Sequence, residues 1–341
     1  MLKRSFPLLA LAALVAAPAS AQEAHEFSYD RPDARQFGPI IGDRLLPAGA
    51  WEIGYTFEQR EADEVRFDED AIDIEDVFQV FGFQIAPFDR RDRWQRIDIS
   101  YGVTDFLTVR GTGRFADFER DVVNDADVLQ RTESDGIGDV EIEAMIEAFN
   151  SRSVRSHISL GVELPTGDDG ESDLNLATGQ VERLPVSMQL GTGSVSLVPG
   201  VTFATQNEYG TVGAQAKARI RVDDSEFGWR RGDVFEARMW AAYRVVDVLS
   251  VHSGVRVHRS GSVEGMDPAS DPTRDPAEDL TRSAATIVSI PLAVNVMLDR
   301  GPLSGTIFSA EFDWPVHQDF ESIRLGTERS FSISIHRAFG M

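Results

Sequence analysis

The stretch TVGAQAKARIR (residues 211–221) alternates between polar and apolar side chains at every second position. Val212 and Ile220 fall on one face together with three alanines, while Lys217, Arg219 and Arg221 fall on the other. A period of two residues indicates a β-strand with one apolar and one polar face.

The same pattern recurs along most of the chain. Short polar turns near residues 102–105, 150–153, 206–210, 246–247 and 299–302 alternate with longer loops rich in Asp, Glu, Gly and Pro. Short turns at one end and long loops at the other are typical of an outer-membrane barrel, whose short turns face the periplasm. The strands are expected near residues 51–58, 94–101, 107–114, 138–148, 157–164, 195–203, 211–221, 235–244, 249–258, 288–296, 308–314 and 329–339.

The predicted fold is therefore all-β: a single transmembrane antiparallel up-and-down β-barrel of about 12 strands. A count of 10 to 14 stays open, because residues 77–85 could form an extra strand, a folded-in loop or an exposed lip. Pro199 and Pro291 fall inside expected strands, so we expect bulges there. A soluble antiparallel sandwich is the alternative, since its strands also alternate.

The first 21 residues resemble a secretory signal. Lys3 and Arg4 precede an apolar run over residues 8–17, and Ala19-Ser20-Ala21 supplies small residues for cleavage after Ala21. No later stretch approaches the ~20 apolar residues of a membrane helix. We expect a signal peptide (1–21), a leader (22–50) that is either periplasmic or a lumenal hatch, and an outer-membrane barrel (51–341).

Charge and cysteine content exclude several classes of partner. The formal net charge is −23 at pH 7, so no binding to nucleic acid is expected. The chain has no cysteine, which excludes disulfides and thiolate metal sites. The expected partners are outer-membrane lipid and lipopolysaccharide, the barrel-assembly machinery during insertion, and a small-molecule solute. No cofactor is expected.

Six short motifs are spread over most of the chain: DRPD (30–33), GAWEIGY (49–55), YGVTD (101–105), GIGDV (136–140), LPTG (164–167) and LGTG (190–193). Together they resemble the outer-membrane transporter family of the MetA pathway of phenol degradation. This resemblance implies a channel for small molecules, including hydrophobic or aromatic compounds, and a distant likeness to fatty-acid transporter barrels. Residues 261–285 look like an insertion, and the final Gly340-Met341 departs from the usual terminal aromatic residue.

If the apolar faces meet lipid, the polar faces line a lumen. One expected strand presents acids and three others present mainly bases, so an acidic wall could face a basic wall. The resulting transverse field would favour small polar or zwitterionic solutes. The alternative is that these side chains pair and plug the lumen. The candidate lumen residues are Asp139, Glu141, Glu143, Glu147, Lys217, Arg219, Arg221, Glu236, Arg238, Arg244, Arg256, His258, Glu311 and Asp313.

Two other functions were weighed. A lipid hydrolase needs Ser and His within reach, and His157 and Ser159 share a strand face, but that face points into the lumen. We therefore expect no enzyme and no metal site. The acidic loops at 63–76, 168–173 and 266–279 carry oxygen ligands suited to Ca²⁺, but none matches a defined calcium loop. These loops also leave open a surface-exposed structural or adhesive role.

Overall fold

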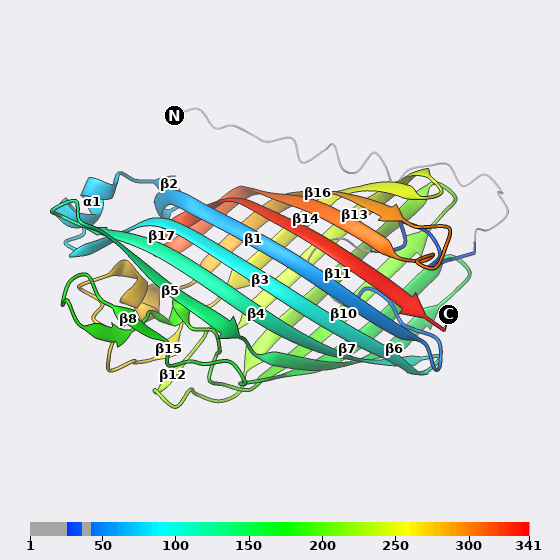
Figure 1. Cartoon of the computed structure of the whole chain (residues 1–341), viewed down its shortest axis with the longest axis horizontal. Helices are drawn as coiled ribbons and strands as arrows, with labels where there is room; N and C mark the ends of the chain where they lie inside the picture. The colour runs from blue at the N-terminus through cyan, green and yellow to red at the C-terminus, as the bar shows by residue number, and fades with distance from the viewer. Residues whose placement is uncertain (1–25, 36–41, 341) are drawn as a thin grey trace.

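The computed structural model describes residues 26–35 and 42–340, which form one closed antiparallel β-barrel (Figure 1). Hydrogen bonding links the strands in the order β17-β16-β14-β13-β11-β10-β7-β6-β4-β3-β1, and β1 pairs again with β17. These strands are β1 (Trp51–Asp68), β3 (Ile85–Thr104), β4 (Leu107–Asn124), β6 (Val140–Asn150), β7 (Val154–Leu164), β10 (Ser196–Gln206), β11 (Gly210–Arg221), β13 (Val234–Val246), β14 (Leu249–Ser260), β16 (Ala285–Met297) and β17 (Ile307–Phe339).

The last strand contributes two arms to the barrel. Eleven elements form the ring and every neighbouring pair is antiparallel, which an odd number of straight strands cannot achieve. The chain reverses inside β17, because residues 307–320 pair with β16 and residues 320–339 pair with β1. Counting the two arms separately gives twelve barrel strands, as the sequence predicts.

The two faces of the strands separate as predicted. Val212 and Met239 are 40% and 62% exposed on the outer surface, whereas Thr211 in the same strand as Val212 is 1% exposed inside. Aromatic residues collect at the short-turn end, where the Trp51 and Tyr101 rings lie 4.5 Å apart. The exposed apolar surface is therefore suited to lipid, and the buried interior is polar, which is the reverse of a soluble sandwich.

One wall of the barrel is taller than the sequence predicts. β4 continues to residue 124, and its upper half pairs with an additional strand, β5 (Leu129–Ile137), while its lower half pairs with β6. Cross-strand ion pairs stabilise this extension, such as Arg131 Nε to Asp121 at 2.7 Å and Arg93 to Glu119 at 2.7 Å. Charged residues occur on both faces here, so the apolar alternation ends before the strand does.

The segment left open at residues 77–85 is an exposed lip. A short strand, β2 (Asp70–Ala71), is followed by the helix α1 (Ile74–Gln79) at the top of the tall wall (Figure 1). Val77 is fully buried there against Val65, Ala86 and Ile323. Because residues 74–79 are helical and the next strand begins only at Ile85, the extra-strand alternative is excluded. None of the helices in the described part of the chain has the length and hydrophobicity to span a bilayer.

Bulges were expected at the two strand prolines, and neither proline itself shifts the register. Pro199 pairs with Leu160 in an unbroken register, and Pro291 pairs with Asp313. The β16–β17 ladder does shift its register close to Pro291, between Val288 and Ser289. Pro199 has no pairing partner on β11, and Pro291 has none on β14. In both ladders the pairing resumes beyond the proline in the same register. The missing N–H is accommodated by losing one bond without inserting a residue.

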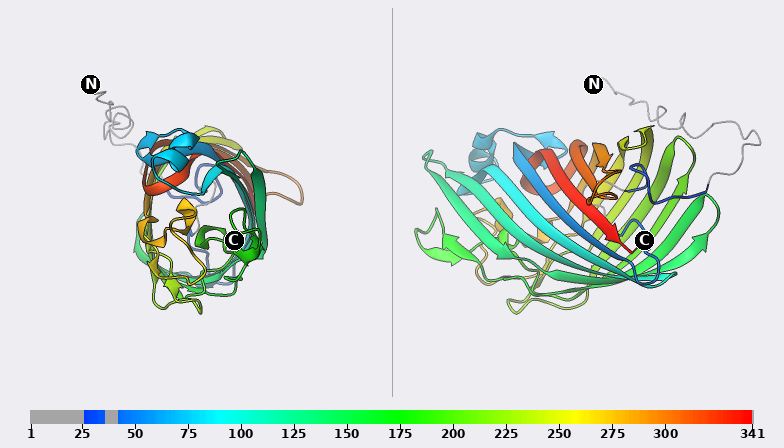
Figure 2. Two further views of the ribbon diagram at one scale, coloured as in Figure 1. Left: turned by 90° about the vertical axis from the view of Figure 1, so that its left-hand side faces the viewer. Right: turned by 45° about the vertical axis from the view of Figure 1, so that its right-hand side comes forward.

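The long loops fold together across the barrel mouth (Figure 2, left). We call residues 165–195, 222–233 and 261–284 the cap. Small apolar clusters hold it together, one around Trp229, Val186 and Leu280 and another joining Met188 and Leu184 to Phe118 of the wall. Its elements are β8 (Ser172–Leu174), β9 (Val181–Arg183), η2 (Val186–Met188), β12 (Trp229–Arg230), β15 (Glu264–Gly265), η3 (Pro276–Glu278) and η4 (Leu280–Arg282).

Candidate functional site

The interior of the barrel carries a dense network of paired charges. Glu141 and Glu143 of β6 point inward together with Glu163 of β7. Lys217 Nζ lies 2.5 Å from Glu143, and Arg219 lies 2.9 Å from Glu141. The acids and bases thus contact one another directly in this part of the lumen.

Three arginines, Arg110, Arg114 and Arg221, complete this first cluster. Glu163 lies 2.6 Å from Arg221 and 3.0 Å from Arg219, and Arg110 forms an ion pair with Glu143. Arg114 approaches Glu163 at 3.8 Å. Buried carboxylates need such partners, because an unpaired charge in a low-dielectric interior is costly. The alternation placed Glu163, Arg110 and Arg114 on inward faces, but only three-dimensional proximity identifies them as partners.

A second cluster lies on β13, β14 and the first arm of β17. Arg256 joins Glu236 at 2.9 Å and Asp313 at 3.4 Å, and His258 Nδ1 lies 3.2 Å from Glu236. Arg238 and Glu311 are also buried on the inward face, and their opposite charges attract each other. Six of the candidate lumen residues are thereby brought together.

Three other candidates lie at the ends of the barrel. Glu147 accepts a hydrogen bond from Asn150 and Arg244 donates to the Glu208 carbonyl, so both lie at the short turns. Asp139 accepts from the backbone N–H of Thr192 at 2.9 Å and from Gly167 at 3.0 Å. Asp139 therefore anchors the cap to β6, and these three residues do not join the central clusters.

The leader enters the barrel from the short-turn end. Residues 26–35 and 42–50 contact inward-facing side chains on many strands and appear in blue within the barrel in the end-on view (Figure 2, left). Gln206 Oε1 accepts from the Ser28 N–H at 2.8 Å, and Asn295 donates to the Arg35 carbonyl at 2.9 Å. The Leu46 N–H bonds to Thr108 at 2.8 Å. The leader is thereby attached on several sides of the lumen.

Charged contacts add to the attachment of the leader. Arg35 lies 2.5 Å from Glu52, 3.2 Å from Asp43 and 2.7 Å from His336 Nδ1. Arg44 also pairs with Glu52. Only about 10 Å³ of free space remains in the cavity beside these residues. The described part of the leader therefore fills the short-turn end of the lumen.

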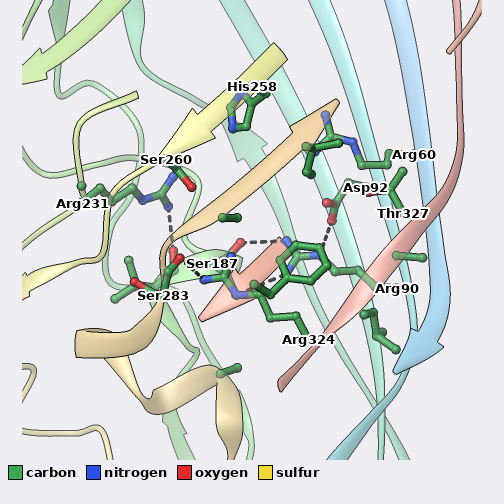
Figure 3. Close-up of a pocket in the computed structure, with 18 of the residues that line it drawn as sticks. Arg60, Arg90, Asp92, Ser187, Arg231, His258, Ser260, Ser283, Arg324 and Thr327 are labelled. Carbon is green, nitrogen blue, oxygen red and sulfur yellow. Dashed lines mark hydrogen bonds and ion pairs between the residues drawn. The ribbon is translucent and has the colours of Figure 1, made fainter. Parts of the chain in front are cut away.

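Two cavities lie between the leader and the cap. The central one, about 230 Å³, is lined by both charge clusters, and the upper one, about 390 Å³, lies beneath the cap. Arg60, Arg256 and His258 line both, so the cavities adjoin. The upper cavity is rich in arginine (Figure 3). Burial lowers the pKa of Arg231 to about 10, which leaves its guanidinium charged at neutral pH.

The weighed catalytic and metal alternatives gain no support. His157 Nε2 lies 2.9 Å from the Gly42 carbonyl, so this ring nitrogen is already hydrogen-bonded to the leader. Ser250 Oγ lies 2.7 Å from His252 Nε2, but both are buried inside the barrel, away from lipid. Within the described ranges, no cluster of His, Asp or Glu has the arrangement of a metal site. The lack of enzyme activity stays a prediction.

The expected signal peptide and its cleavage site lie outside the described residues. No family model matches the chain, and no curated protein matches it either. The pathway named by the sequence resemblance therefore stays a prediction.

Solved structures do resemble the protein. The COG4313 outer membrane channel from Pseudomonas putida F1 is 15% identical, with a TM-score of 0.60, over 87% of this chain and 98% of that one. A Pseudomonas aeruginosa FadL homologue is 9% identical (TM-score 0.43, over 85% and 90%), and the KdgM porin is 7% identical (0.40, over 84% and 99%). The first of these likenesses shows that the chain has the fold of an outer-membrane β-barrel.

Proposed function

We propose that the protein is an outer-membrane channel for small solutes whose periplasmic end is closed by its own leader. The adjoining cavities under the cap and between the charge clusters carry this proposal, because they offer a solute a polar space inside a lipid-facing barrel. The structurally similar P. putida protein is described as an outer membrane channel, which agrees with this proposal. Solutes would enter through the cap and leave when the leader yields.

The charge network suggests which solutes pass. Both carboxylates and a larger number of basic side chains line the central cavity, so a solute that carries charge can exchange contacts with the wall as it moves. A purely apolar compound would have to displace these ion pairs without replacing them, which is costly. We therefore favour polar or charged small molecules, including aromatic compounds that carry a polar group.

Leader deletion tests this function directly. A variant lacking residues 22–46 should fold, as judged by heat-modifiable gel mobility, and should show a much larger conductance in planar bilayers than the full chain. Liposome swelling with sugars of increasing size would measure the opening. If a folded full-length chain and a folded deletion variant both give no conductance, the proposal fails.

An adhesive role is less favoured. Such a function would use the long loops, yet the cap residues pack inward through buried contacts such as Arg120 with Asp275 at 2.7 Å. The lip formed by β2 and α1 remains available for surface contacts. Binding to host or neighbouring-cell ligands in the absence of any conductance would favour this role.

A further inference from the structure

Two of the arginines that line the upper cavity have no carboxylate at ion-pair distance among the described residues. Many arginines line it, and several have carboxylate partners: Arg120 with Asp275, and Arg90 Nε with Asp92 at 2.8 Å. Arg231 and Arg324 differ. In the part of the chain that the structure describes, neither forms an ion pair.

Among the described residues, both of these arginines donate to backbone carbonyls and to no side chain. Arg231 Nη2 bonds to Val186 O at 2.7 Å and Gln189 O at 2.8 Å, and Arg324 Nη2 bonds to Ser283 O at 2.6 Å. The Arg231 Nε is buried and has no hydrogen-bond partner. Figure 3 shows the two side chains entering the same space from the loop before β13 and from β17.

A third guanidinium increases the positive potential. Arg90 lies close enough to repel both Arg231 and Arg324. Arg90 pairs with Asp92, whereas Asp139 and Glu163 attract Arg231, and Glu321 attracts Arg324, without forming an ion pair. The cavity lining carries more arginines than carboxylates, although the whole chain is strongly acidic. Converging cations in a partly enclosed space favour an anion, and a guanidinium matches the two oxygens of a carboxylate.

Part of the lining is apolar. Val186, Leu280, Phe320 and Ile323 contribute side chains beside the arginines. A free volume of about 390 Å³ is within the range of small-ligand sites. The cavity thus offers both charged contacts and apolar surface.

We propose that the upper cavity binds a small organic carboxylate, with its head between Arg231 and Arg324 and its apolar body against Leu280 and Ile323. This inference names a solute class for the channel and so rests on the proposed function. Binding would recruit solute from outside before it reaches the central charge clusters. Inorganic phosphate could satisfy the arginines but would leave the apolar surface unused.

The test measures binding without transport. Full-length protein in detergent would be titrated calorimetrically with benzoate and hexanoate, with their neutral amides, and with inorganic phosphate. We expect a carboxylate to bind, and its amide and phosphate to bind at least tenfold more weakly. No binding of either carboxylate, equal binding of the amides, or phosphate binding as tight as the carboxylates would overturn the proposal.

Substitutions locate the site. Arg231→Gln and Arg324→Gln should each weaken carboxylate binding about ten- to hundredfold, since each removes a charge-assisted contact. Arg324→Lys keeps the charge but not the paired N–H groups of the guanidinium, so it should weaken carboxylate binding less than Arg324→Gln does. Arg230→Gln is the matched control, because Arg230 adjoins Arg231 but pairs with Glu264 outside the cavity.

One outcome tests the location of the site, and two more separate the inference from the proposed function. Equal weakening by Arg230→Gln and Arg231→Gln, with native gel mobility in both, would refute the assigned location. Conductance with no carboxylate binding would refute the site and leave the channel standing. Binding without conductance, even after removal of the leader, would refute the channel and leave the site standing.

Discussion

Arg35→Ala should loosen the leader and open the channel. The side chain contacts Glu52 at 2.5 Å, Asp43 at 3.2 Å and His336 at 2.7 Å, all in a buried setting. Removing one partner of a buried ion pair costs about 3–5 kcal/mol. Because Arg44 still contacts Glu52, we take the lower end, about 3 kcal/mol. This cost shifts the equilibrium between the bound and the released leader by about a hundredfold.

Two measurements should report the same shift. In planar bilayers, the fraction of time that the channel is open should rise by up to about a hundredfold. Hydrogen exchange should accelerate by the same factor at the Ser28 and Leu46 amides, which bond to Gln206 and Thr108.

The control is Arg300→Ala, which removes an arginine that is 91% exposed in a short turn. It should change neither conductance nor exchange. If Arg35→Ala accelerates exchange of the leader but conductance stays flat, the leader is not the gate. If neither quantity changes, the buried contacts of Arg35 do not hold the leader in place.

Three further predictions concern the lumen, the lipid face and the cap. Reversing Arg219 and Arg221 to Glu should shift ion selectivity towards cations, measured as a reversal potential in a salt gradient; an unchanged potential would exclude these residues from the conduction path. Leu160→Arg should destabilise the barrel by about 2–4 kcal/mol in urea titrations in lipid, whereas Val181→Arg on the cap should have little effect. Burial raises the pKa of Glu278 above its usual 4.5, because the folded cap favours the protonated carboxyl. This preference stabilises the cap fully below pH 4.5, and the stabilisation is lost as the pH rises through the raised pKa of the folded state. Glu278→Gln should flatten the pH dependence of cap hydrogen exchange, and an unchanged profile would contradict the assignment.

The strand pattern was readable from sequence because lipid imposes a strict alternation. Val212 is apolar and lies on the outer face, whereas its neighbour Thr211 is polar and lies inside the barrel. That constraint ends where the wall rises beyond the lipid-facing zone. Residues 115–137 carry charge on both faces, so nothing in their periodicity distinguishes β5 from a loop.

The inner site was only partly predictable. Alternation predicts inward faces for Glu141 and Arg219, yet it cannot predict that their side chains meet at 2.9 Å. The leader and the cap have no strand periodicity, so the contacts of Arg35 and Arg231 depend on tertiary folding alone. The prolines show a further limit, because a strand can lose one hydrogen bond without changing register.

The seam between β1 and the second arm of β17 has a consequence for biogenesis. Trp51 lies opposite Phe339, so residues from nearly the two extremes of the polypeptide must find each other before any edge disappears. Contacts of such long sequence separation form slowly, since ordering the intervening chain costs entropy first. Until then an unpaired edge is exposed and prone to associate with other chains. Truncations at the C-terminus should therefore cause aggregation, because an open sheet cannot be completed from the remaining strands.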